Sequence, residues 1–159
     1  MKFDLKNRTS SVPVERTIAR IEQALARAGA ASIVKEYGPA ADVSALKFDI
    51  AVAESQVVTI HLPVNTRAVA EKMHRDFCAR PRRVRRAMPK VEHFMPQAER
   101  TAWKLMQDWV EVQLSLIAMK QAEFLAVFLP YVYNPSTRTT FYAQLKASGM
   151  RGLLPERTS

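Results

Sequence analysis

The chain has 159 residues, of which 48% are apolar and 25% are charged, a composition typical of one globular domain and not of a disordered protein. Its formal net charge is +9, from 24 Lys and Arg against 15 Asp and Glu, which favours a polyanionic partner. The single cysteine, Cys78, excludes an intrachain disulfide, and because no long apolar run is present we expect a cytoplasmic protein that does not enter a membrane.

The first helix is predicted from about residue 13 to residue 28, after a polar stretch, residues 1–12, that we expect to be an extended arm. Gly29 supplies a C-terminal stop for this helix. The residues that recur at helical spacing are Val14, Ile18, Ile21, Leu25 and Ala28.

Three strands are predicted next, because the hydrophobic period changes from 3.6 to 2 in residues 32–37, 43–53 and 57–62. In the second stretch Leu46, Phe48 and Ile50 alternate with polar residues, which predicts one buried and one wet face. The intervening segments are short and rich in turn residues. An antiparallel meander is the simplest arrangement of these strands.

Helices dominate the second half of the sequence. Asn65 or Thr66 can cap a helix that must end before Pro81. A long apolar helix is predicted from about Gln97 to a break near Lys120, and short helices follow, the last over residues 138–147.

The predicted fold class is therefore α+β: an N-terminal helix, a three-stranded antiparallel meander, a helix, a basic linker, and then a long C-terminal helix and short helices. We expect one globular domain over residues 13–155, with a basic connection at residues 80–97 and a loose tail at residues 156–159.

The densest positive charge lies between Arg80 and Lys90, where six of eleven residues are basic and none is acidic. Five of the six are arginines, whose planar guanidinium groups suit phosphate contacts better than lysine does. We therefore predict a nucleic-acid-binding surface, supported by Lys72 and Arg75 on the preceding helix. The basic cluster, as we call it, consists of Arg80, Arg82, Arg83, Arg85, Arg86 and Lys90.

The mode of binding that these residues support is phosphate contact with little base specificity, with DNA favoured over RNA as the partner. The helix, meander, helix order matches double-stranded RNA-binding domains, but residues 65–72 lack the basic run of that family. The predicted wet face of the sheet offers Lys35, Lys47, Thr59, His61 and, as its one candidate aromatic for stacking, Tyr37. A helix-turn-helix is weakly indicated.

A competing hypothesis is a protein-interaction or assembly module. The apolar arc of the long helix is wide, which is typical of a central core helix or of one shared with another subunit. In this alternative the chain forms a homo-oligomer through Trp109, Val112, Leu116 and Met119, and the arginines bind a protein partner.

Enzymatic and metal chemistry is weakly indicated. His74 and Cys78 stand four residues apart on one helix, but no second pair completes a zinc site, and a free cysteine beside Phe77 is typical of a small buried hydrophobe. The acids Asp42, Asp49 and Glu54 complete no familiar magnesium-nuclease motif. We predict no enzyme, no metal and no cofactor.

Several segments are similar to an uncharacterised family of small proteins encoded by phages, prophages and other mobile elements. They are Val12-Pro13-Val14-Glu15, Leu62-Pro63-Val64, Thr101-Ala102-Trp103-Lys104, Asp108-Trp109-Val110-Glu111-Val112-Gln113-Leu114 and Val127-Phe128-Leu129-Pro130-Tyr131. Matching pieces run from about Ser11 to Pro155. The resemblance implies a role in phage or mobile-element DNA metabolism, and it carries over no activity or active-site residue.

Overall fold

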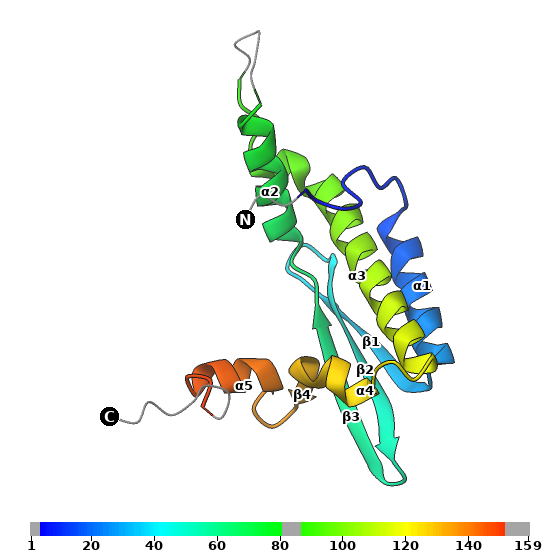
Figure 1. The fold of residues 1–159 in the computed structure, drawn as a ribbon. Coiled ribbons are helices and arrows are strands. Elements are labelled where there is room, and N and C mark those ends of the chain that lie inside the picture. Colours follow the sequence, from blue (N-terminus) through cyan, green and yellow to red (C-terminus); the bar gives the residue numbers. More distant parts are fainter. Residues whose placement is uncertain (1–3, 81–86, 152–159) are drawn as a thin grey trace. The chain divides into compact units, whose positions relative to one another are not determined.

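The structure is a computed structural model that describes residues 4–80 and 87–151. It confirms the predicted α+β class and order of elements, with a long helix after the meander and short elements at the end (Figure 1). The elements are α1 (Val14–Arg27), β1 (Ala30–Tyr37), β2 (Val43–Ala53), β3 (Gln56–Pro63), α2 (Thr66–Cys78), the 3-10 helix η1 (Val91–Phe94), α3 (Met95–Ala118), α4 (Phe124–Phe128), the 3-10 helix η2 (Leu129–Tyr131), β4 (Val132–Asn134), β5 (Thr139–Thr140) and α5 (Phe141–Ala147).

The chain divides into two compact units. The helical unit comprises Met1–Leu25 and Pro63–Leu114, and the sheet unit comprises Ala26–Leu62 and Ser115–Ser159. Sixteen basic and nine acidic residues give the helical unit a net charge of +7, whereas eight basic and six acidic residues give the sheet unit +2. That the two units unfold together as one domain stays a prediction.

The helical unit has a tightly packed junction of α2 and α3. Ala70, Met73 and Ala98 are almost fully buried, and the side chains of Phe94 and Met95 pack against them. Two alanines at this junction allow close packing between neighbouring helices. The side chain of Asn65 caps α2 by accepting a hydrogen bond from the Ala68 amide at 2.9 Å, as one of the two predicted caps.

The segment before α1 is attached to α3 by hydrogen bonds within the helical unit. Gln97 Nε2 donates to the carbonyl oxygens of Arg8 and Ser10 at 2.9 and 3.0 Å, and Thr101 Oγ1 donates to the carbonyl of Asn7 at 3.1 Å. Thr101 is fully buried, so this bond satisfies a hydroxyl that water cannot reach. The described part of the predicted arm is therefore held by side chains of α3.

Asp108 on α3 completes this attachment. Its carboxylate accepts a hydrogen bond from Asn7 Nδ2 at 2.9 Å and lies 2.9 Å from Lys104 Nζ and 3.1 Å from Lys6 Nζ. Burial opposes the charged form, but the hydrogen bonds from Asn7, Lys104 and Lys6 outweigh it and lower the pKa of Asp108 to about 2.

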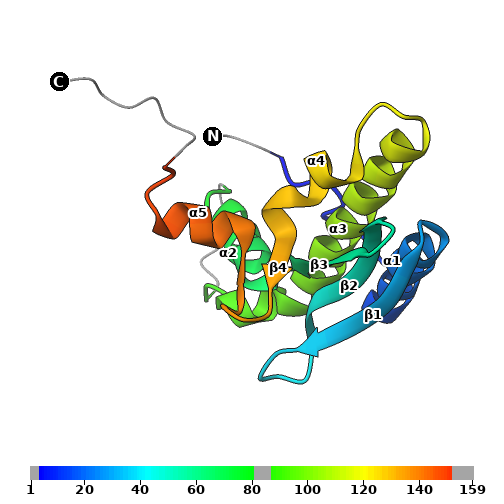
Figure 2. The same ribbon diagram turned by 90° about the horizontal axis from the view of Figure 1, so that it is seen from below.

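The sheet unit contains one five-stranded sheet in the order β1-β2-β3-β4-β5. Figure 2 labels the first four of these strands. Strands β4 and β5 were not predicted, since they have only three and two residues. β4 pairs antiparallel with β3, with Tyr133 opposite Thr59, and thereby joins the C-terminal region to the meander. A turn at residues 135–138 connects β4 to β5.

One face of the sheet carries the core of this unit, as the alternation in β2 predicts. Leu46, Phe48 and Ile50 are buried on that face. The ring of Phe48 meets those of Phe124 and Phe128 edge-on, with ring centroids 6.4 and 6.0 Å apart. Such edge-on pairs add to the free energy gained by burying the aromatic area. The opposite face carries polar side chains from β1 to β4.

The buried side of α3 differs from the apolar stripe that spacing alone favours. Trp103 and Val110 are 1% and 0% exposed, whereas Val112 and Met119 are 55% and 65% exposed. The helix also begins two residues before the predicted start, with Pro96 in its first turn, where the missing amide hydrogen is tolerated. No helix within residues 4–80 and 87–151 is long and apolar enough to cross a membrane.

A backbone motif ends α3 close to the predicted break. The amide of Lys120 donates to the carbonyl of Ile117 at 3.0 Å, and the amide of Gln121 donates to that of Leu116 at 2.9 Å. Lys120 adopts a left-handed φ of 56°. This is the pair of bonds of a Schellman stop, in which glycine is the usual left-handed residue.

Candidate nucleic-acid interface

Both ends of the basic cluster are anchored in the helical unit. Arg80 lies two residues beyond the end of α2, and Lys90 immediately precedes η1. The Phe94 ring of η1 packs against the rings of Phe77 and His74 on α2, with centroids 5.6 and 5.9 Å apart. The aromatic contacts therefore hold η1 against the last turns of α2. Arg82, Arg83, Arg85 and Arg86 lie outside the residues that the structure describes.

The acids nearest to the cluster in sequence, Asp76 and Glu92, bind cations outside it. Asp76 accepts both short contacts of Lys72 Nζ, at 2.6 and 2.7 Å, and lies 3.4 Å from Arg8. Glu92 binds Arg67 at 2.9 Å. The hydrogen bond from Lys72 lowers the pKa of Asp76, and a backbone hydrogen bond followed by that from Arg67 lowers the pKa of Glu92. The nearest carboxylates thus remain charged and already have partners.

The predicted site residues that the structure describes differ in how available they are. Arg75, Arg80 and Lys90 are exposed. Lys72 is half-buried, and its ammonium is held by Asp76. A phosphate could contact the three exposed cations directly, but it would have to compete with Asp76 for Lys72.

The histidine and cysteine of α2 form a hydrogen-bonded pair. Cys78 Sγ lies 3.4 Å from His74 Nε2, and both residues are half-buried, with the imidazole against Phe94. Aromatic packing and one hydrogen bond account for both side chains in structural terms. Among the described residues, no group of three or more His, Cys, Asp and Glu is placed to hold a metal ion.

A polar network covers the outer face of the sheet unit. Glu36 of β1 binds Lys47 of β2 at 2.5 Å and His61 of β3 at 2.9 Å. Lys47 Nζ lies 4.0 Å from the centroid of the Tyr133 ring on β4, in a cation–π contact. Lys47 and His61 were expected on this face, whereas Lys35, also expected there, lies opposite the buried Leu46 and so belongs to the other face. Glu36 and Tyr133 were missed, because only the strand register brings them beside Lys47 and His61.

Asp49 forms a second group on the same face. Its two oxygens accept hydrogen bonds from Ser32 Oγ and Thr59 Oγ1, each at 2.6 Å. These bonds, that from Ser32 first, lower the pKa of Asp49. Lys47 is therefore paired with Glu36, and Asp49 is satisfied by two hydroxyl groups, which makes this face a poor surface for phosphate.

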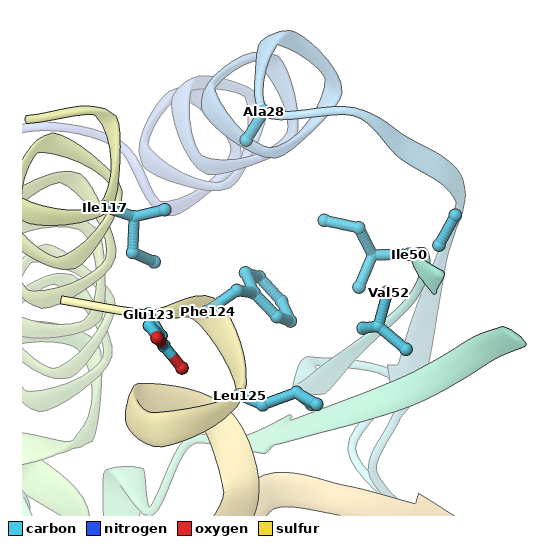
Figure 3. A pocket seen from close by; sticks show the side chains of 8 residues that line it. Ala28, Ile50, Val52, Ile117, Glu123, Phe124 and Leu125 are labelled. Carbon is cyan, nitrogen blue, oxygen red and sulfur yellow. The ribbon is translucent and has the colours of Figure 1, made fainter. Parts of the chain in front are cut away.

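A pocket opens on the buried side of the sheet unit, with a volume of about 350 Å³. Its lining is mainly apolar, and Figure 3 shows the Phe124 ring between Ile117 on one side and Ile50 and Val52 on the other. Glu123 is the charged residue of the lining. An apolar pocket whose charge is negative does not suit a phosphate backbone.

No family model, no curated protein and no solved structure matches the chain. The assignment of a function therefore depends on the residues and their arrangement.

Proposed function

We propose that the protein binds nucleic acid through phosphate contacts of the basic cluster. The observation that carries this proposal is that the cluster belongs to a unit of net charge +7, in which the two carboxylates nearest to the cluster in sequence are held by Lys72, Arg8 and Arg67. A concentrated positive charge raises the density of polyanions beside it and releases their counterions on contact.

The chemistry of the cluster favours backbone contact over base recognition. Arginine forks bind phosphate oxygens in any sequence context, and the sequence of the cluster, which contains Pro81 and Pro89, does not have the pattern of a recognition helix. The outer face of the sheet unit, where Lys47 and His61 both contact Glu36, offers less positive charge to a phosphate than the helical unit does. We therefore propose binding with little sequence preference and without catalysis.

Arg75 and Lys72 have different roles in the proposal. Arg75 is exposed near the end of α2 and extends the cluster. Lys72 contributes less, since a phosphate must displace it from Asp76. Replacing Asp76 by asparagine would free Lys72 and Arg8 and is expected to tighten binding.

DNA is the proposed partner, in phage or mobile-element DNA metabolism. This part of the proposal is supported by the resemblance of the segments around Trp103, Trp109 and Phe128 to small proteins of such elements. Single- and double-stranded DNA and RNA of equal length distinguish the partners directly. Tighter binding to RNA than to either form of DNA would redirect the proposal.

The decisive experiment is a salt titration of binding to these four nucleic acids. Each phosphate neutralised contributes about 0.7 to 0.9 to the slope of log K against log salt. Changing Arg82, Arg83, Arg85 and Arg86 together to alanine is expected to reduce that slope by roughly 3 and to weaken binding strongly at moderate salt.

A matched control separates the cluster from net charge. The pair Arg82→Ala/Arg83→Ala and the pair Arg16→Ala/Arg20→Ala each remove two arginines from the helical unit, the second pair from exposed positions on α1. We expect the first pair to weaken binding far more than the second. Equal losses would mean that overall charge, and not the cluster, attracts the polyanion.

The competing hypothesis of an assembly module makes the opposite prediction. It requires no binding to any of the four nucleic acids at moderate salt, together with a stable oligomer in light scattering. The half-exposed Val112 on α3 is the observation that favours it, since an apolar side chain in that position is available to a partner.

A further inference from the structure

The sheet of the sheet unit has one long open margin. β1, with eight residues, is the first strand of the sheet and pairs with β2, and within the described residues no strand pairs with its other side (Figure 2). β5, at the opposite margin, has two residues. A long unpaired edge is a template for another strand, and proteins commonly shield such edges with prolines or short strands. β1 contains no proline.

The regular part of β1 is short and symmetric about one residue. Register irregularities separate Ala30 from Ser32 and Glu36 from Tyr37, which leaves Ser32–Glu36 as the regular stretch. Val34 is the central residue of these five. It is 53% exposed and lies opposite Lys47, on the polar outer face of the sheet. Packing within the sheet does not account for a large exposed apolar side chain at this position.

The direction of the backbone fits pairing at this margin. The carbonyl oxygen of Glu36 faces β2, where it accepts a hydrogen bond from Ser44 Oγ at 3.3 Å. Backbone groups of successive residues in a strand point to opposite sides. Those of Val34 therefore also face β2, and those of Ile33 face the open margin.

We propose that β1 pairs antiparallel with β1 of a second copy of the chain, around a twofold axis at Val34. In this register Val34 meets Val34 of the second copy as a non-hydrogen-bonded pair, whose side chains approach most closely. Ser32 lies opposite Glu36, and Ile33 lies opposite Lys35. The two sheets become one sheet of ten strands.

A second copy suits this margin because the register is self-complementary. No residue of the regular stretch meets a like charge, whereas a shift of the axis by one residue toward Tyr37 would place Lys35 opposite Lys35. The modest +2 charge of the sheet unit also opposes the approach of two copies far less than the +7 of the helical unit would. Because only five residues pair, the dimer should be weak and dependent on concentration.

Sedimentation velocity over a wide concentration range tests this interface with two matched variants. Val34→Lys places two positive charges together at the axis, and Val112→Lys adds the same charge at an equally exposed valine, 55% against 53%, on α3. We expect the unchanged protein and Val112→Lys to dimerise and Val34→Lys to stay monomeric while retaining its circular dichroism spectrum. A monomer at every concentration, or a dimer lost in Val112→Lys and kept in Val34→Lys, would overturn the proposal.

A disulfide cross-link tests the register. Cα atoms of a non-hydrogen-bonded pair lie about 4.5 Å apart, within the range that a disulfide spans. With Cys78 changed to serine, Val34→Cys is expected to form a covalent dimer under mild oxidation. The control Val57→Cys, also with serine at position 78, places a 64% exposed residue on β3 and should not cross-link. Equal cross-linking of both variants would contradict the proposed axis, as would a purified monomer that carries a peptide on β1.

Discussion

The two units use charged side chains in opposite ways. In the helical unit Asp76 and Glu92 are held by Lys72 and Arg67, which lie outside the basic cluster, and the unit keeps a net charge of +7. In the sheet unit Glu36 binds both Lys47 and His61 across three strands, and the net charge is only +2. A net charge of +9 says little about where a polyanion binds, and the division of the chain assigns most of it to one unit.

The largest effect is expected from breaking one core at a time. Trp103 in the helical unit and Phe48 in the sheet unit are each 1% exposed. Changing either to alanine should lower the free energy of unfolding by about 3 to 5 kcal/mol through lost burial and the cavity that remains. Denaturation followed by circular dichroism measures this loss.

The same variants test whether the units unfold together. Both tryptophans lie in the helical unit, so tryptophan fluorescence reports on that unit alone. Because α3 continues from one unit into the other, we expect Phe48→Ala to shift the fluorescence transition as much as the circular dichroism transition. An unshifted fluorescence transition would show two independently unfolding units.

A smaller effect is expected at the attachment of the N-terminal segment to α3. The pKa of Asp108 is about 2 in the folded protein, below its usual value of 3.8, so its charge stabilises the fold above about pH 4. That contribution, about 2 kcal/mol, is lost as the pH falls from about 4 toward 2. Asp108→Asn should therefore be less stable than the unchanged protein at pH 7 and nearly equal to it at pH 2.

A second substitution keeps this prediction testable. Asn7→Ala removes one hydrogen bond to Asp108 while keeping its charge, and should raise the pKa of that carboxyl. An NMR pH titration of Asp108 measures the change directly. An unaltered titration would remove Asn7 from the cause of the low pKa.

Much of this fold follows from local patterns. The bounds of β2 agree with the alternation around Phe48, and the Asn65 cap marks the start of α2, because both signals lie within a few residues of the element they define. β4 and β5 carry no such signal. They exist because Tyr133 reaches Thr59, more than seventy residues earlier in the chain, and periodicity does not encode that pairing.

The buried side of α3 shows a different limit. Its apolar arc is wide enough to allow several orientations of the helix. The hydrogen bond of Thr101 to Asn7 and that of Gln107 to Glu111 let two polar side chains enter the core, which turns Val112 toward solvent. A prediction from hydrophobic spacing disfavours this orientation of the helix, because it places the polar residues Thr101 and Gln107 in solvent.

An effect of intermediate size is expected on nucleic-acid binding by the basic cluster, where the charge of the side chains can be separated from the planar shape of the guanidinium groups. Changing Arg82, Arg83, Arg85 and Arg86 to lysine keeps the charge but removes the planar forks. We expect the salt slope of binding to stay the same and the affinity to fall about fivefold, roughly 1 kcal/mol. An affinity equal to that of the unchanged protein would make the contacts purely coulombic.

The smallest effect is expected on the outer face of the sheet. Glu36 is 36% exposed, and the hydrogen bond from Lys47 is the main cause of its lowered pKa. Because solvent and salt screen such a pair, Glu36→Gln should cost less than about 1 kcal/mol at pH 7. The cost should vanish as the pH falls below the usual pKa of a glutamate, since protonation removes the same charge. Urea denaturation at pH 7 and pH 3 measures both values, and a cost above about 2 kcal/mol would assign the network a larger role.

The end of α3 has a consequence for how this sequence can change. Lys120 holds a left-handed backbone that glycine adopts without the crowding of a side chain, so the helix stops at a position where its own residue is disfavoured. A single exchange to glycine would recover about 1 kcal/mol. The protein is thus less stable than a one-residue change would make it. A lineage that acquired that exchange could tolerate a destabilising substitution elsewhere without losing the fold.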